Sequence, residues 1–227
     1  MKEKKFFSIL IVTSFIFVIS FSSNAKESDS LLEESYGKKI QKYLERSDNE
    51  EVSMSKSLEL CENNTIVLPQ KEINMAKDFY VSAGSDKKDA EGLAVEYVKE
   101  VNSLYQEAIK NGYTATDEEI KEHLELLKKE IDIAENKEEI YVFINTFDNE
   151  QDYWDFQFEM FKKDLPIQKY IAAKEQAFLD KCIKNNSKKT EARKVDATAV
   201  LEYQDEWDKQ FLNMKENVVN KYDFLVE

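Results

Sequence analysis

The side chains that most often carry out enzyme chemistry are scarce in this chain and lack catalytic spacing. Its single histidine, His123, excludes the two-histidine zinc helix H-E-x-x-H and lies in a charged stretch, where we expect it at the solvent edge. The sequence contains no G-x-S-x-G nucleophile elbow and no C-x-x-C redox pair. Its four glycines form no P-loop or dinucleotide fingerprint, because backbone amides approach a phosphate closely only where such glycines stand.

Carboxylates are so numerous that their clustering carries no enzyme signal. The chain has 46 Asp and Glu residues, so neighbours such as Glu138 and Glu139 are common, and helix N-termini favour them in any case. The D-x-D-x-D-G spacing of calcium loops is absent. We therefore predict a protein without enzyme activity, catalytic residues, cofactors or a dedicated metal site.

The two cysteines, Cys61 and Cys182, leave the redox chemistry open. In an exported protein they could form one disulfide. However, 120 residues lie between them, and sequence alone does not show whether they meet in space. The pattern is equally compatible with two free thiols.

The first 25 residues have the layout of a secretory signal peptide. The basic start MKEKK is followed by the apolar run FFSILIVTSFIFVISF and the small residues SSNA. An uncleaved membrane anchor would need ~20 apolar residues, whereas serines and a threonine interrupt this run. We expect cleavage after Ala25, no stable membrane insertion afterwards, and a mature protein that is secreted or lies outside the cytoplasmic membrane.

The mature chain is strongly acidic. Without residues 1–25 it keeps 29 Lys and Arg residues against 45 Asp and Glu residues, a net charge of −16. A surface of this charge repels phosphate backbones and anionic lipids. We therefore predict that nucleic acid is not a partner.

Composition and apolar spacing predict an all-α, mainly helical fold. Glycine and proline are rare, while Lys, Glu, Leu and Ile are abundant, as is typical of helical proteins. Helical periodicity recurs along the chain, with start signals such as Ser85 and the Thr116–Glu119 capping box. The helices are expected at about 28–48, 70–84, 86–111, 117–131, 137–147, 150–184 and 190–220.

Two stretches depart from the helical pattern. Alternating apolar residues around Asn63 and Asn64 predict a small β-hairpin near 57–68. The tail KYDFLVE, residues 221–227, also alternates. It predicts a short closing strand, for which the hairpin is the available partner.

The stretch DYWDFQFEMFKKDLPIQKY, residues 152–170, is unusually rich in aromatic side chains. On a helix, its apolar residues and those that follow it form two stripes rather than one. Either this helix packs between two layers of neighbours, or one stripe faces the core and the other lines an exposed groove. Pro166 cannot donate a hydrogen bond to the carbonyl of Lys162, so it predicts a bend.

Two longer segments carry a family resemblance. They are LYQEAIKNGYTATDEEIKEHLELLKKE, residues 104–130, and EQDYWDFQFEMFKKDLPIQKYI, residues 150–171. In order and spacing they resemble the N-terminal chaperone domain of SurA-like proteins, a family that includes the PrsA-type foldases and many exported proteins of Gram-positive bacteria. The likeness covers about residues 66–182.

The helical pattern and the resemblance together predict a domain organisation. An N-terminal helical segment at 26–56 precedes a SurA-like helical domain at 57–227, which the helix at 190–220 closes. The family often carries a parvulin prolyl isomerase domain, for which this chain has neither the length nor the histidines. Isomerase activity is therefore not implied.

The resemblance also implies a function. We expect an exported, non-enzymatic, chaperone-like protein, a monomer or weak homodimer, that binds unfolded or partly folded polypeptides through an apolar aromatic groove. The residues expected to bind these clients are Tyr97, Val101, Tyr105, Trp154, Phe158, Met160 and Phe161. The alternative is a secreted or envelope-associated helical interaction protein with one dedicated protein partner.

Overall fold

The computed structural model describes residues 36–45, 61–62, 64–187 and 197–227. The predicted signal peptide lies outside the described residues, as does most of the predicted N-terminal segment at 26–56. All structural statements below concern the described part of the chain.

Helices dominate the structure, which confirms the mainly helical fold predicted from the sequence. They are α2 (Tyr36–Glu45), α3 (Gln70–Ser82), α4 (Lys87–Lys110), α5 (Asp117–Ile133), α6 (Lys137–Ile144), α7 (Glu150–Ser187) and α8 (Ala197–Val219). None of these helices combines the length and the apolar character that crossing a membrane requires.

Local sequence signals set several helix boundaries. The predicted capping box at the start of α5 is present: Glu119 N donates to Thr116 Oγ1 at 3.2 Å, and Thr116 N donates to Glu119 Oε2 at 2.8 Å. At the start of α4, Asp86 rather than the expected Ser85 is the cap, because its carboxylate accepts from the backbone N–H groups of Lys88 and Asp89. A carboxylate serves this position better because it also complements the helix dipole.

A small three-stranded sheet joins residues 61–68 to the C-terminal strand. Strand β1 (Cys61–Glu62) pairs antiparallel with β2 (Thr65–Leu68), and Asn64 in the turn between them has a φ of 65°. The closing strand β3 (Asp223–Val226) runs parallel to β2, with Ile66 opposite Phe224. The predicted hairpin, over its described residues, and the predicted pairing of the tail are therefore confirmed.

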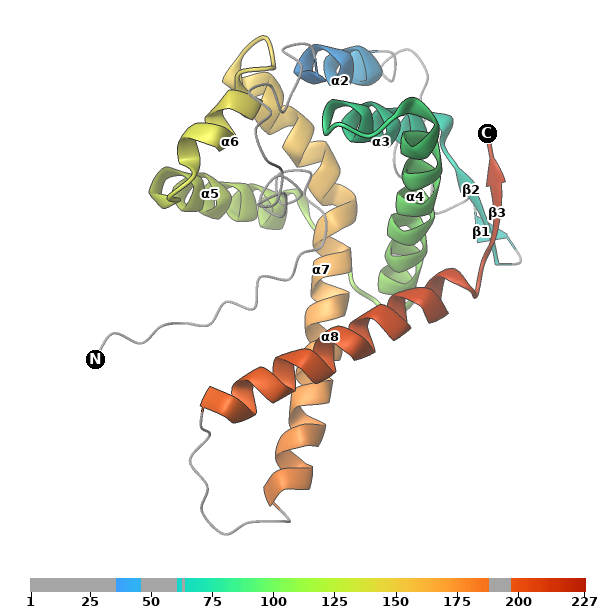
Figure 1. Ribbon diagram of the computed structural model, residues 1–227, viewed down its shortest axis with the longest axis vertical. Helices are drawn as coiled ribbons and strands as arrows, with labels where there is room; N and C mark the ends of the chain where they lie inside the picture. The colour runs from blue at the N-terminus through green and yellow to red at the C-terminus, as the bar shows by residue number, and fades with distance from the viewer. Residues whose placement is uncertain (1–35, 46–60, 63, 188–196) are drawn as a thin grey trace.

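The long helix α7 forms the axis around which the other helices are arranged (Figure 1). Its first half lies among α2, α3, α5 and α6, while α4 runs beside its middle. Helix α8 crosses its second half and leads into β3 at the far side of α4 (Figure 1). The chain therefore returns from the end of α7 to the sheet that precedes α3.

Two hydrophobic clusters surround α7, one along each half. The N-half cluster consists of the buried residues Ile40, Met75, Phe79, Ile120, Leu124, Ile131, Ile140, Phe143, Ile144, Phe147, Tyr153, Trp154, Phe156, Phe161 and Leu165. The C-half cluster consists of Ile66, Leu68, Ile73, Ala76, Ala94, Val98, Val101, Leu104, Tyr105, Ala108, Ile167, Tyr170, Ile171, Phe178, Trp207, Val218 and Tyr222.

Pro166 lies at the boundary between these clusters. Leu165 belongs to the N-half cluster and Ile167 to the C-half cluster. The helix runs without a break through the proline, so Pro166 does not split it. Figure 1 shows α7 changing direction near its middle, where Pro166 lies in the sequence, as a missing i to i−4 hydrogen bond leads one to expect.

Candidate functional site

The structure buries most of the residues predicted to bind clients. Of the seven, Tyr97, Phe158 and Met160 are half-buried. The other four are buried: Val101 is 7% exposed, Tyr105 8%, Trp154 6% and Phe161 2%. The aromatic stretch of α7 is therefore mainly core.

The same seven residues do not line one groove. Tyr97, Val101 and Tyr105 pack in the C-half cluster, whereas the four α7 residues pack in the N-half cluster. Trp154 shows how neighbours cover its stripe. Its Nε1 donates to Glu150 Oε1 at 2.9 Å, and Lys128 Nζ lies 4.8 Å from the centroid of its ring. Up to Ile171 most of both apolar stripes is covered because α7 has neighbours on both sides, the first of the two arrangements that the sequence leaves open; farther along, Ala172 is exposed.

His123 is half-buried rather than at the solvent edge. Its ring centroid lies 4.7 Å from that of Phe161. Burial lowers the pKa of His123 below its ordinary value of 6.5, and the negative charge of Glu130 opposes that shift. Among the described residues, no three His, Cys, Asp or Glu side chains gather as a metal site requires.

A buried polar network ties three helices together. Lys163 of α7, only 4% exposed, donates to Glu72 Oε1 of α3 at 2.5 Å and to Asn102 Oδ1 of α4 at 3.1 Å. Asn102 in turn donates to Glu72 Oε2 at 2.9 Å. A buried charge is tolerated when its partners satisfy it in this way, and breaking such a pair usually costs about 3–5 kcal/mol.

Asp164 lies beside this network and is almost completely buried, with an exposed fraction of 5%. Burial raises the pKa of its carboxyl well above the ordinary 3.8; the positive charge of Lys163 opposes the shift and the negative charge of Glu72 adds to it. The burial of Asp164 has a signal in the sequence. At about 100° per residue, Asp164 falls between the two apolar stripes of α7, a position where a charged residue has to be buried.

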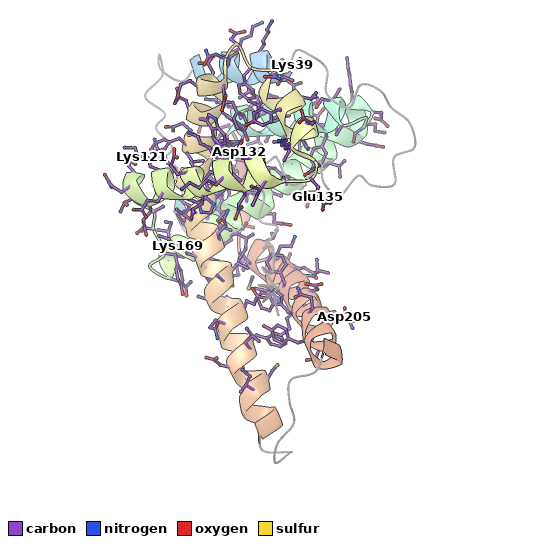
Figure 2. All side chains as sticks on the ribbon, turned by 90° about the vertical axis from the view of Figure 1, so that its left-hand side faces the viewer. Lys39, Lys121, Asp132, Glu135, Lys169 and Asp205 are labelled. Carbon is purple, nitrogen blue, oxygen red and sulfur yellow. The ribbon has the colours of Figure 1, made fainter. Side chains whose placement is uncertain are left out.

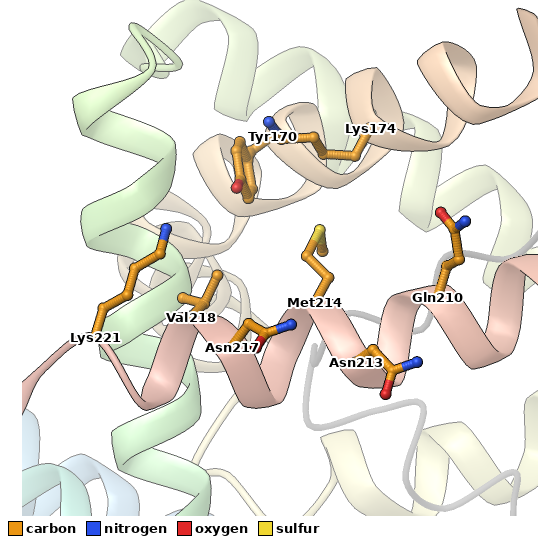
Figure 3. Close-up of a pocket in the computed structure, with 8 residues that line it drawn as sticks. All are labelled: Tyr170, Lys174, Gln210, Asn213, Met214, Asn217, Val218 and Lys221. Atoms are coloured by element: carbon orange, nitrogen blue, oxygen red, sulfur yellow. The ribbon is translucent and has the colours of Figure 1, made fainter. Parts of the chain in front are cut away.

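Within the described part of the chain, an open pocket lies between α7 and α8. It has a volume of about 370 Å³ and opens to solvent. It is lined by Tyr170, Lys174, Gln210, Asn213, Met214, Asn217, Val218 and Lys221. Figure 3 shows Met214 pointing from α8 toward Tyr170 of α7. We call this feature the α7–α8 pocket.

The rim of the α7–α8 pocket is rich in amides. Gln210, Asn213 and Asn217 are exposed, and within the described part of the chain none of the three has a hydrogen-bond partner. Lys174 lies 4.9 Å above the ring of Tyr170. The floor is apolar, since Met214 is half-buried and Val218 is buried. This rim has little signal in the sequence, because exposed amides on an amphipathic helix resemble any solvated face.

One end of the pocket is held by a hydrogen-bonded corner. Lys221 Nζ lies 2.8 Å from Glu107 Oε2, and the hydroxyl of Tyr222 donates to Glu107 Oε1 at 2.9 Å. Burial raises the pKa of Glu107, but these two hydrogen bonds and the charges of Lys221 and Lys110 outweigh it and lower the pKa below its ordinary value. The ionised carboxylate thus fixes the end of α8 against α4.

Aromatic side chains hold α8 against the second half of α7. The ring centroid of Phe178 lies 5.2 Å from that of Tyr203 and 5.8 Å from that of Trp207. Figure 2 shows these two helices side by side below the rest of the molecule, with side chains of both between them. Cys182, near the end of α7, is a half-buried free thiol, and burial followed by the charge of Glu206 raises its pKa.

Comparison with known protein families, with curated proteins and with solved structures finds no match to this chain. The resemblance to SurA-like domains therefore depends on the sequence pattern described above.

Proposed function

We propose that this chain is an exported, non-enzymatic, chaperone-like protein that holds unfolded or partly folded polypeptides in the α7–α8 pocket. The observation that carries the proposal is the combination of an apolar floor with three unpartnered amides at the rim. Its export rests on the sequence of residues 1–25, and the SurA-like pattern of helices supports the same class of function.

The chemistry of the rim suits polypeptide backbone. Each amide side chain offers both a donor and an acceptor. Every residue of an extended chain except proline presents one backbone N–H and one C=O. Gln210, Asn213 and Asn217 can therefore pair with a client whatever its sequence. The floor formed by Met214 and Val218 accepts apolar side chains without demanding one shape, because methionine is flexible and polarisable.

The expected affinity is low. Burial of one apolar client side chain contributes about 1.5–3 kcal/mol, and each amide hydrogen bond about 0.5–1.5 kcal/mol. Association itself costs roughly 4–15 kcal/mol in lost translational and rotational freedom. A pocket of this size therefore binds weakly and reversibly, which is suitable for holding a polypeptide that must later be released.

The test removes the rim and leaves the floor. The triple variant Gln210→Ala, Asn213→Ala, Asn217→Ala changes exposed side chains only, so its urea unfolding should match the wild type. The probe is carboxymethylated lysozyme, which stays unfolded, and fluorescence anisotropy measures its binding. Suppression of aggregation of a thermally unfolding protein is the second measurement. We expect at least a fivefold loss in both.

A matched variant controls for the number of substitutions in α8. Lys209→Ala, Leu212→Ala, Glu216→Ala changes three exposed residues of the same helix that do not line the pocket and should bind the probe as the wild type does. Equal losses in both triple variants, or no loss in the rim variant, would contradict the assignment of the pocket.

A dedicated partner is the alternative outcome. A wild-type chain that leaves the unfolded probe unbound and aggregation unchanged, but binds one folded protein tightly, would be a helical interaction protein rather than a chaperone.

A further inference from the structure

Helix α2 sits in a groove that is distinct from the α7–α8 pocket. It lies against α3 and α7, at the end of the molecule where α6 leads into α7 (Figure 1). Ile40 is fully buried in the N-half cluster. Gln41 Nε2 donates to Asp152 Oδ2 at 2.6 Å. Adjacent positions of α2 thus contribute one aliphatic contact and one polar contact to this groove.

A glycine fixes how closely this helix approaches. Gly37 N donates to Thr146 Oγ1 at 3.0 Å, and Thr146 Oγ1 donates to the carbonyl of Phe143 at 2.8 Å. A β-carbon at position 37 would lie 2.5 Å from the backbone nitrogen of Phe147. Backbone atoms cannot move aside as a flexible side chain can, so the groove accepts only glycine at this point.

The charges of helix and groove are complementary. Helix α2 carries Lys38, Lys39 and Lys42 against one acidic residue, in a chain of net charge −14. Figure 2 labels Lys39 on α2 at the upper end of the molecule. The connection from α6 to α7 has the opposite sign, since residues 146–152 contain Asp148, Glu150 and Asp152 and no basic residue.

The short length of α2 indicates that its binding in the groove is reversible. A helix of 10 residues is marginal on its own in water, so α2 depends on the groove for its helical form. An amphipathic helix lying in a groove is a recurring mode of peptide recognition.

We propose that the groove beneath α2 is an exchangeable helix-docking site. Its partner is a basic amphipathic helix of another polypeptide that carries glycine opposite Thr146 and an aliphatic residue three positions later. Helix α2 occupies this site in cis and competes with such a partner, since a tethered segment acts at a high effective concentration. Weakening the cis contact therefore opens the groove to a helix in trans.

The experiment measures binding of a fluorescein-labelled peptide with the sequence LLEESYGKKIQKYLERSD, residues 31–48. Fluorescence anisotropy compares its affinity for the predicted mature chain, residues 26–227, with that for the Gly37→Ala variant of the same chain. The added β-carbon displaces α2 from the variant, so we expect the variant to bind the peptide at least ten times more tightly. The affinity should fall as salt screens the opposite charges.

A matched glycine variant provides the control. Gly92 lies exposed in α4, and a β-carbon there would meet nothing within 4 Å. Gly92→Ala should therefore bind the peptide no better than the wild type. A peptide carrying Gly37→Ala should fail to bind the opened chain, because it repeats the clash in trans.

A second variant keeps the proposal falsifiable if Gly37→Ala does not fold. Ile40→Ala removes the anchor of α2 without a clash and should give a smaller gain in affinity. No gain in any folded variant would overturn the proposal, as would equal binding of the wild-type peptide and the Gly37→Ala peptide.

Discussion

Neighbouring helices enclose α7 much more completely up to Ile171 than beyond it. Between Tyr153 and Ile171 most side chains are buried, whereas beyond Ile171 the exposed positions outnumber the buried ones and Phe178 is the main buried anchor among the described residues. One continuous helix thus serves first as the axis of a core and then as one wall of an open pocket. The difference arises from what packs against each half.

The two halves of α7 also differ in whether their charged side chains are buried. The first half buries Lys163 and Asp164 beside Glu72 and Asn102. The second half keeps its charged residues, such as Lys174 and Asp180, in water. A buried charge needs partners that satisfy its hydrogen bonds. The first half of α7 therefore requires particular residues on the neighbouring helices, whereas the second half accepts substitutions of its charged residues.

Truncation of a buried aromatic residue should separate the halves most strongly. Phe156→Ala, at a fully buried site of the N-half cluster, is expected to cost about 3–5 kcal/mol. Phe211→Ala in α8, where the ring is only half-buried against Trp207, should cost about 1 kcal/mol. Urea unfolding followed by circular dichroism measures both. Similar losses would mean that the two halves are equally enclosed.

The charge at Asp164 should make the stability of the first half depend on pH. The unfolded chain releases this proton near 3.8, whereas the folded chain retains it to higher pH because burial raises the pKa. Wild-type stability therefore falls as pH rises from 3.8 through the raised pKa. Asp164→Asn, which cannot ionise, should be more stable than the wild type above that range, and the advantage should shrink toward pH 4.

Urea midpoints at a series of pH values test this expectation. Asp155→Asn is the control, since Asp155 is exposed on the same helix and should leave the pH profile of the wild type unchanged. A profile for Asp164→Asn parallel to that of the wild type would mean that the Asp164 carboxyl has the same pKa in the folded and unfolded chains, which would contradict the raised pKa.

The smallest expected effect lies at the boundary between the halves. Pro166→Ala restores a backbone donor to α7, worth about 1 kcal/mol, but removes the bend to which both clusters are fitted, and repacking strain costs about 1–3 kcal/mol. We expect a net loss of about 1 kcal/mol. Trp154 and Trp207 report on separate clusters, so fluorescence unfolding of single-tryptophan variants measures each half. A gain in stability would show that the bend has no structural role.

Local signals in the sequence predicted most of the fold. The capping box at Thr116, the left-handed turn at Asn64 and the apolar spacing of α4 act over a few residues, and each appears in the structure. The predicted Ser85 cap was wrong by one position: Asp86 is the cap, because its carboxylate accepts from two backbone N–H groups and also complements the helix dipole.

The candidate site was less predictable. The number of aromatic residues in α7 made them candidates for a contact surface and left a core position as the alternative, because a count of apolar residues does not reveal which neighbours cover them. Trp154 and Phe161 are in the core, while the open pocket lies at Met214 and the amides around it. Whether an apolar stripe of a helix lies in the core or at the surface depends on which helices, distant in sequence, pack against it.

The sequence by itself determined the helices, their caps, the hairpin and the absence of familiar catalytic motifs, because these depend on residues close together along the chain. Tertiary structure alone decided that β3 pairs in parallel with β2, that α8 crosses only the second half of α7, and that Gly37 meets Thr146. Each of these contacts joins residues far apart in sequence. Their formation is governed by the summed packing of the two clusters, which no local pattern encodes.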